Sequence, residues 1–351
     1  MQNDLSQSAQ LQKLNQLQQL SFSPQINQRA GLNPLLLQQQ QQQQQAQVQA
    51  QLQAQQLQAQ QQQQQQQQHQ PPQVPGSVPL PITTVKEVWN DNFHQEFNII
   101  RQLITQYNYV SFSTEFPGIL ARPIGVFTST NDYHYQTLRT NTDLLNLIQF
   151  GISLSDSNGK KPDNIYSTWQ FNFKFDLNSE MISNEAFESL VKTGIDFNRH
   201  QMLGIDQFEF AELLTSSGLI LLPNVYWTSF HSGYDFGFLI SLLTNNQMPS
   251  KEEDFLHKIG LFFPNLYDLK ILSKGLTNKE TNPKLSLENL ADELNIPRLN
   301  IFVSTGGQAL LTNLTFIEMK NKLHDINKFN GLIHGLVTEQ QQQQNPLLNE
   351  L

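Results

Sequence analysis

The sequence predicts an α/β fold, a mixed sheet flanked by helices, and three observations support this prediction. Short apolar runs that end at turn-forming residues are interspersed with longer segments in which apolar residues recur at helical spacing. Strands are expected first, and then strands mixed with helices, which is typical of a sheet covered by helices. The unit between residues 85 and 337 is also long enough to bury a full hydrophobic core.

The elements of this unit follow from local patterns. Phe93, Phe97, Ile100 and Ile104 recur at i, i+4, i+7 and i+11, so we expect a first helix there. Strands are expected at 109–113, 148–155, 168–175, 225–231 and 265–268. Further helices are expected at 183–193, from 232 onward, and at 255–263, 286–294 and 310–323, where caps and stop signals bound several of them.

The strands at 148–155 and 168–175 should pair as an antiparallel hairpin, because turn-forming residues at 156–159 lie between them. Aromatic residues alternate with polar ones along 168–175, which predicts one buried face. The same aromatic residues could instead form a stacking platform for RNA bases. The alternation favours the interpretation as hydrophobic core.

Low-complexity segments flank the predicted domain. Residues 1–84 are rich in glutamine and proline, with near-homopolymer glutamine runs at 38–45 and 60–68, and residues 338–351 contain another run. Such segments bury too little apolar surface to offset the entropy lost on ordering. We therefore expect a disordered tail at 1–84, a folded domain at 85–337 and a second tail at 338–351.

Composition excludes several classes of protein. The net charge of −9 argues against a polybasic nucleic-acid binder. The absence of cysteine excludes disulfides and thiolate zinc sites, and it agrees with a protein of the cytoplasm and nucleus. No apolar run approaches the roughly 18–20 residues of a membrane span, and the N-terminus lacks the apolar core of a secretory signal. We expect no membrane association.

Polar residues in apolar surroundings gather in three short segments. In the first, Ser113 and Glu115 end a strand and, being two residues apart, project to the same face. The second segment is 230–237, in which Asp235 comes just after a strand. The third is 304–311, which opens the last helix. Two carboxylates at i and i+2 would suit a divalent metal, but here only Glu115 is acidic.

Four motifs carry a resemblance to a known family: TEFPG at 114–118, ARPIG at 121–125, STWQFNF at 167–173 and HSGYDFG at 231–237. The chain resembles the CAF/POP-type poly(A) deadenylase subunit of the CCR-NOT complex, a DEDD-type exonuclease with an RNase H-like fold. The resemblance extends from residue 88 to residue 335. It implies a sheet of five to six strands and the 3′-to-5′ removal of AMP from poly(A) RNA. It also implies two partners, a leucine-rich-repeat deadenylase and the helical-repeat domain of the NOT scaffold.

The resemblance also implies a site in which four acids hold two divalent ions, Mg²⁺ or Mn²⁺, and a histidine activates water. Glu115 and Asp235 match two of the acids and are the expected catalytic residues. Ser113, Gln308 and Val303 stand where the family has two further acids and the histidine. Ser113 and Gln308 would be weak, neutral metal ligands. Fungal members of the family carry a similar serine and glutamine, so the pattern resembles a lineage feature.

These departures predict weak metal binding and slow or absent hydrolysis, because loss of a positioned general base alone costs ~10²–10⁴-fold in rate. Two functions stay open, and they do not exclude each other. The chain is predicted first as a poly(A)-specific exoribonuclease with a degenerate site, and the alternative is a catalytically vestigial module that bridges an active deadenylase to the NOT scaffold.

Four polar positions have more than one interpretation. Asp235 is a metal ligand or the first-turn acid of a helix. Arg122 contacts RNA phosphate or forms a structural ion pair. His231 contacts RNA or replaces the missing base, although a strand-end histidine is more often structural. Asp268 is an auxiliary acid or, as we favour, a turn residue.

Overall fold

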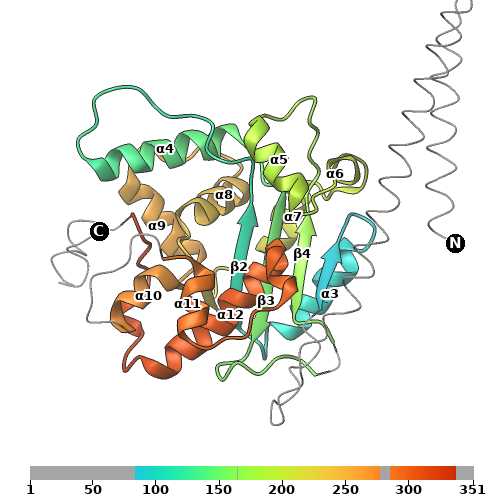
Figure 1. Cartoon of the computed structure of the whole chain (residues 1–351), viewed down its shortest axis with the longest axis vertical. Coiled ribbons are helices and arrows are strands. Elements are labelled where there is room, and N and C mark those ends of the chain that lie inside the picture. The colour runs from blue at the N-terminus through green and yellow to red at the C-terminus, as the bar shows by residue number, and fades with distance from the viewer. Residues whose placement is uncertain (1–83, 164, 277–284, 337–351) are drawn as a thin grey trace, which may run out of the picture. The chain divides into compact units, whose positions relative to one another are not determined.

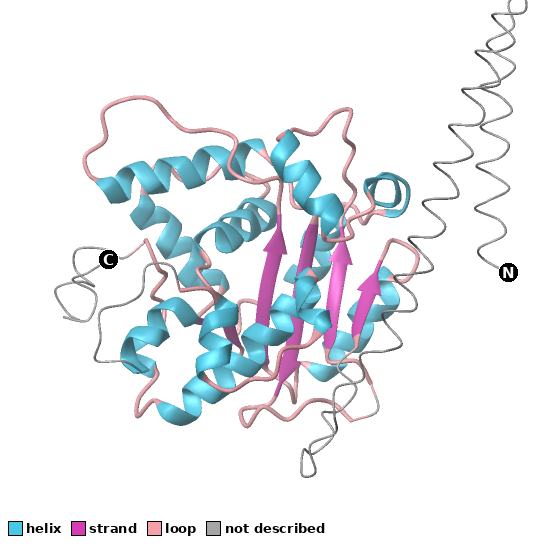
Figure 2. Cartoon of the chain, viewed as in Figure 1, coloured by secondary structure: helices cyan, strands magenta, loops and turns pink. Residues whose placement is uncertain are grey.

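A computed structural model describes residues 84–163, 165–276 and 285–336 of the chain. Six strands form one mixed sheet in the order β1-β4-β3-β2-β5-β6 (Figures 1 and 2). Strand β3 runs antiparallel to both of its neighbours, and the other pairings are parallel. The α/β prediction is confirmed. The strands are β1 Val85–Val88, β2 Tyr109–Glu115, β3 Gln149–Ser155, β4 Thr168–Asn172, β5 Tyr226–Ser229 and β6 Asn265–Asp268.

Helices cover both faces of this sheet. On one face α12 crosses β2, β3, β4 and β5, with α10 and α11 beside it (Figure 1). Helices α3, α4, α7, α8 and α9 build the core on the other face. The helices are α3 Phe93–Leu103, α4 Thr130–Leu144, α5 Asn184–Lys192, α6 Phe197–Leu203, α7 Gln207–Thr215, α8 Gly233–Thr244, α9 Glu252–Phe262, α10 Leu269–Leu276, α11 Leu287–Glu293 and α12 Thr305–Lys322, with short 3₁₀ turns η1 Asn300–Val303 and η2 Asn327–Phe329.

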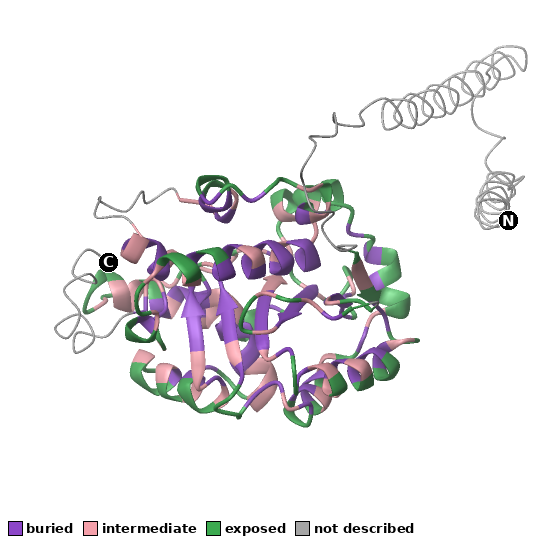
Figure 3. Cartoon of the chain, turned by 90° about the horizontal axis from the view of Figure 1, so that it is seen from below, coloured by how far each residue is buried: buried purple, intermediate pink, exposed green. Residues whose placement is uncertain are grey.

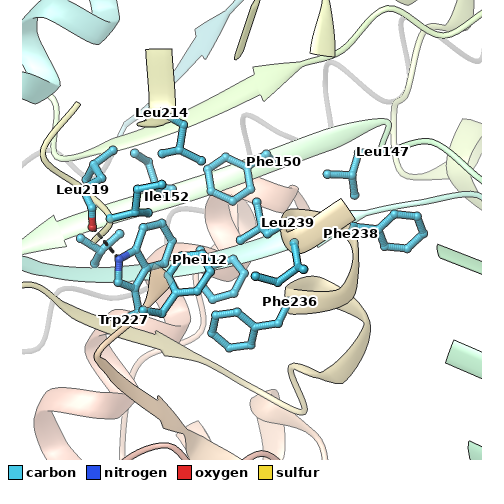
Figure 4. Close-up of a cluster of buried hydrophobic side chains, with 14 of the residues drawn as sticks. Phe112, Leu147, Phe150, Ile152, Leu214, Leu219, Trp227, Phe236, Phe238 and Leu239 are labelled. Atoms are coloured by element: carbon cyan, nitrogen blue, oxygen red, sulfur yellow. Dashed lines mark hydrogen bonds between the residues drawn. The ribbon is translucent and has the colours of Figure 1, made fainter. Parts of the chain in front are cut away.

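Aromatic side chains fill the core on the face opposite α12. Phe112 packs edge-on against Trp227 and Phe236, with ring centres 5.2 Å and 5.0 Å apart (Figure 4). Trp227 satisfies its indole N–H by donating to the Leu219 carbonyl oxygen at 2.8 Å. Buried residues concentrate on the strands and on the helix sides that face them (Figure 3). Since side chains alternate along β2, the residues next to Phe112 face α12 instead.

The expected elements are found in the predicted order, with some corrections. The last helix begins at Thr305 and not at 310, because Ser304 caps it by accepting a hydrogen bond from the Gly307 N–H. Strand β4 ends at Asn172 and not at 175. The prediction of a single buried face on β4 was wrong, because its polar residues are buried as well as its aromatic ones. The strand therefore belongs to the core and offers no exposed stacking platform.

The tails predicted at 1–84 and 338–351 lie outside the described residues, apart from Thr84. Within the described ranges, none of the helices has the length and apolar character needed to cross a bilayer.

The first turn of α12 lies unusually close to β3. A β-carbon added at Gly151 would lie 2.5 Å from the Thr305 carbonyl oxygen and 2.8 Å from the Gly306 α-carbon. Two buried amide side chains of the sheet hold this turn: Gln149 accepts a hydrogen bond from the Thr305 hydroxyl at 2.7 Å, and Gln170 accepts one from the Gly306 N–H at 3.0 Å. Glycine at 151 therefore permits the contact that fixes where α12 begins.

A buried polar network continues the contact along α12. The Asn313 amide donates to the hydroxyls of Ser111 and Ser155, both at 3.1 Å, and its oxygen accepts from the Lys161 ammonium at 2.6 Å. Lys161 also donates to Ser153 at 2.9 Å. Burial lowers the pKa of Lys161 to about 7, because its acceptors are neutral. The network pins the middle of α12 to β2 and β3.

We expect Gly151→Ala to destabilise the fold. The added methyl group would force the first turn of α12 off the sheet, and overpacking of this kind costs about 1–3 kcal/mol. Urea unfolding of the wild type and of Gly151→Ala measures the loss in free energy of unfolding. Gly125→Ala is the control, because a β-carbon there meets no atom within 4 Å. Equal stability of the two variants would contradict the tight contact.

Candidate active site

Ser113 and Glu115 lie on the face of β2 that α12 covers. In the sheet register Ser113 is opposite Gly151 and Glu115 is opposite Gln149. Glu115 lines a cavity of about 150 Å³ whose wall also contains Gln149, Val303 and Thr305. The prediction that the two strand residues share a face is confirmed, and that face meets the beginning of α12.

Asp235 reaches the same strand end from the first turn of α8. Its Oδ1 atom accepts hydrogen bonds from the Thr114 backbone N–H at 2.9 Å and from the Thr114 hydroxyl at 2.6 Å. Thr114 stands between Ser113 and Glu115 in the chain, so these bonds fix Asp235 beside Glu115. Asp235 is indeed a first-turn acid, as one interpretation predicted. That position is compatible with metal binding.

The two carboxyl groups have raised pKa values. Burial, reinforced by the charge of Asp235, raises the pKa of Glu115 to about 7. Burial raises the pKa of Asp235 to about 6, although the hydrogen bonds from Thr114 oppose the shift. In the part of the chain that the structure describes, neither group has an ion-pair partner. Two half-buried, mutually repelling carboxyls without a counter-charge fit a divalent cation, which would favour their ionised forms.

Val303 stands at the rim of the same cavity. It ends the 3₁₀ turn η1, directly before the α12 cap, and its side chain is 73% exposed. The structure therefore places Val303 beside the cavity that Glu115 lines. Valine has no atom that can accept a proton.

Gln308 borders a neighbouring cavity of about 350 Å³, and Val303 lies between the two cavities. The Gln308 Nε2 atom donates to Glu288 Oε1 at 2.9 Å and to the Phe302 carbonyl oxygen at 2.6 Å. No group of three or more acidic, histidine or cysteine side chains placed to hold a metal occurs within the described ranges. Of the acids predicted for the site, Glu115 and Asp235 are brought together, whereas Glu87 and Asp196 also line the Glu115 cavity.

Asp268 has a structural role, as we favoured. It is buried and accepts hydrogen bonds from the backbone N–H groups of His231, Ser232, Lys270 and His334, at 2.9–3.2 Å. These bonds tie β6 to the segment that enters α8. The carboxylate of Asp268 therefore fixes the backbone just before Asp235.

His231 and Arg122 have different surroundings. The His231 ring packs edge-on against His334, with centres 4.8 Å apart, and burial lowers its pKa. Arg122 is exposed, and no ion pair of its side chain is found among residues 84–163, 165–276 and 285–336. Its charge opposes the burial that raises the pKa of Tyr234 to about 12, so the two side chains are neighbours. RNA contact by either residue stays a prediction.

Two residues of the site were not predicted from the sequence. Thr114 holds Asp235 across 121 positions of the chain, and Glu288 holds Gln308 across 20. Thr114 lies inside a recognised motif, which is a weak signal. Nothing in the local pattern around Glu288 distinguishes it from an ordinary first-turn acid.

We expect Glu115→Gln to stabilise the metal-free protein above pH 7. Because folding raises this pKa from 4.5 to about 7, the folded state keeps a proton that the unfolded chain releases. The stability from that proton is present below about pH 4.5 and is lost as the pH rises through 7. The variant should gain on the order of 3 kcal/mol at pH 8 and little at pH 4.

Urea unfolding in a chelator at both pH values measures this difference. Glu188→Gln, at an exposed position on α5, is the control for the change of charge. A pH-independent difference between wild type and Glu115→Gln would contradict the assigned environment.

Comparisons with known proteins agree with this site and fold. The model of the CAF1 family ribonuclease matches residues 88–213. Poly(A) ribonuclease POP2 of Saccharomyces cerevisiae is 49% identical over 275 residues, which cover 73% of this chain and 63% of that protein. Poly(A) ribonuclease pop2 of Schizosaccharomyces pombe is 45% identical over 244 residues, 70% of this chain and 71% of that protein. The chain thus spans less than two thirds of the S. cerevisiae relative.

Solved structures show the same similarity. S. pombe Pop2p in a Mg²⁺- and Mn²⁺-bound form has a TM-score of 0.67 at 43% identity, covering 72% of this chain and 99% of that one. Yeast CAF1 co-crystallised with the NOT1 MIF4G domain has a TM-score of 0.64 at 45% identity, covering 74% and 100%. The helix-flanked mixed sheet is the RNase H-like fold that the sequence predicted, and the chain belongs to the CAF1 family of ribonucleases.

Proposed function

We propose that this chain is a deadenylase subunit of a CCR-NOT complex, a 3′-to-5′ exoribonuclease that releases AMP from poly(A) with weakened catalysis. One observation carries the proposal. Glu115 and Asp235 converge at a strand end, half-buried and without a counter-charge, in a chain 43% identical to a relative solved with Mg²⁺ and Mn²⁺. We place the protein in the cytoplasm and nucleus.

Glu115 and Asp235 would hold the divalent ion, with the Ser113 hydroxyl and the Gln308 amide oxygen as neutral ligands. The bound ion would supply a water of lowered pKa and stabilise negative charge on the phosphate. Thr114 keeps the Asp235 carboxylate oriented. Val303 accepts no proton, so deprotonation of water lacks the side-chain base of the family. Arg122, exposed near the site, would contact RNA phosphate.

A bridging function is the second candidate, and the yeast complex favours it. In that complex CAF1 is joined to the NOT1 MIF4G domain, and the CAF1 fold extends over 74% of this chain. The equivalent helical-repeat domain of a NOT scaffold is the partner we propose. A leucine-rich-repeat deadenylase is the second proposed partner. Bridging needs an intact fold but no metal at Glu115, so the two functions are separable by mutation.

Metal-dependent shortening of 5′-labelled poly(A) should require both retained acids. Glu115→Ala and Asp235→Ala each remove a charged ligand worth several kcal/mol, so we expect losses of roughly 100-fold or more. The purified chain is assayed with Mg²⁺ or Mn²⁺, with Glu188→Ala as the control acid. Equal rates in all four proteins would indicate a contaminating nuclease and leave the bridging function.

Restoring the family residues should raise activity. Ser113→Asp, Val303→His and Gln308→Asp together supply two ligands and a base, and the base alone is worth ~10²–10⁴-fold. The rate of Mg²⁺-dependent shortening is compared between wild type and the triple variant, with circular dichroism as the test of folding. A folded triple variant without any gain would show that these positions do not limit catalysis.

A further inference from the structure

We propose that Glu288 is a positioning residue of the site: it fixes the orientation of the Gln308 carboxamide and is the acid with which a neutral residue at 308 is paired. The inference rests on the proposed metal site at Glu115 and Asp235. It concerns residues of α11 and α12 that border the cavity next to that site.

The contacts of Gln308 determine which way its amide points. Both N–H groups of Nε2 have acceptors, Glu288 Oε1 at 2.9 Å and the Phe302 carbonyl oxygen at 2.6 Å. The reversed amide would place an oxygen against two oxygen acceptors, which is repulsive. The planar amide is therefore held with Oε1 on the edge away from Glu288. Across the described residues, no hydrogen-bond donor to Oε1 is found, so this oxygen remains available to a cation.

Glu288 is itself firmly placed. It lies in the first turn of α11, whose cap Ser286 accepts a hydrogen bond from the Asn289 N–H. Both Glu288 and Gln308 are half-buried, so their contact is screened less than an exposed one. Groups of this kind, which hold a metal ligand without touching the metal, typically change metal affinity 10–100-fold.

The same contact explains why position 308 is neutral in this chain. An acid at 308 would bring a second carboxylate close to Glu288, and two carboxylates in one site repel each other. Glutamine instead donates to Glu288. In this part of the site Glu288 on α11 therefore carries the negative charge, and Gln308 on α12 contributes a neutral amide dipole. Glu288 and Gln308 are complementary as acceptor and donor, so replacing only one of them can remove their hydrogen bond or introduce repulsion.

Asp292 provides a matched control. It lies one turn further along α11, lines the same cavity, and accepts a hydrogen bond from Arg298 Nε at 2.9 Å. Asp292→Ala removes the same charge from the same helix as Glu288→Ala, but it leaves the Gln308 contacts in place.

The first experiment measures Mn²⁺ binding to the full chain by titration calorimetry. We expect Glu288→Ala, which removes the acceptor of the Gln308 amide, to weaken binding about 10- to 100-fold. Asp292→Ala should leave it near wild type, and Glu115→Ala should abolish it. Equal affinities of Glu288→Ala and Asp292→Ala would overturn the positioning role. Unchanged binding in Glu115→Ala, or no binding in wild type, would instead refute the proposed metal site.

The second experiment tests the pair without metal. In a chelator, Gln308→Asp should lower the melting temperature by several degrees. Adding Glu288→Gln should recover most of this loss, and adding Asp292→Asn should recover much less. Gln308→Asp could instead lower the melting temperature equally in the wild-type, Glu288→Gln and Asp292→Asn backgrounds. That result would overturn the pairing of residues 288 and 308, whatever the metal titration shows.

Discussion

The close approach of α12 to β3 is the contact on which the site depends. Glycine at 151 lets the Thr305 carbonyl lie against the sheet, and Gln149 and Gln170 satisfy the polar groups of that first helical turn. Because the helix is rigid, fixing its first turn also places the residues just before and just after it. Val303 thereby reaches the rim of the Glu115 cavity, and Gln308 reaches the adjoining one.

Strand β2 uses both of its faces at this end. Ser113 and Glu115 project toward α12, whereas Thr114 is directed to the other face, where α8 lies. Thr114 holds Asp235 there through two hydrogen bonds. This end of β2 thus contacts helices on both faces of the sheet, and it brings Glu115 within electrostatic reach of Asp235 on α8. Asp268 supports the same arrangement by fixing the backbone that enters α8.

Periodicity was sufficient to predict most of the sheet and six of the ten α-helices within the described residues. It missed α4, whose buried positions include the polar Thr137, Asn141 and Thr142, and it missed the short helices α6, α7 and α10 and the short edge strand β1. The site was predicted as far as local motifs extend, namely Ser113, Glu115 and Asp235. The contacts of Thr114 and Glu288 join distant segments, and such pairings depend on how α8, α11 and α12 pack. No local sequence pattern encodes that packing.

The electrostatics of the site indicate what the neutral residues Ser113 and Gln308 do for the stability of the fold. Two carboxyls already have pKa values near 7 and 6, so without metal they destabilise the folded state at neutral pH. Further acids at 113 and 308 would add to this repulsion, and at 308 the repulsion would include Glu288. Serine and glutamine avoid that repulsion, at the expense of charge available to bind divalent ions. A chain that must keep its fold in order to bridge partners gains stability from this exchange, and a chain that must cut RNA loses rate by it. The balance between the two proposed functions is therefore set by the same two positions.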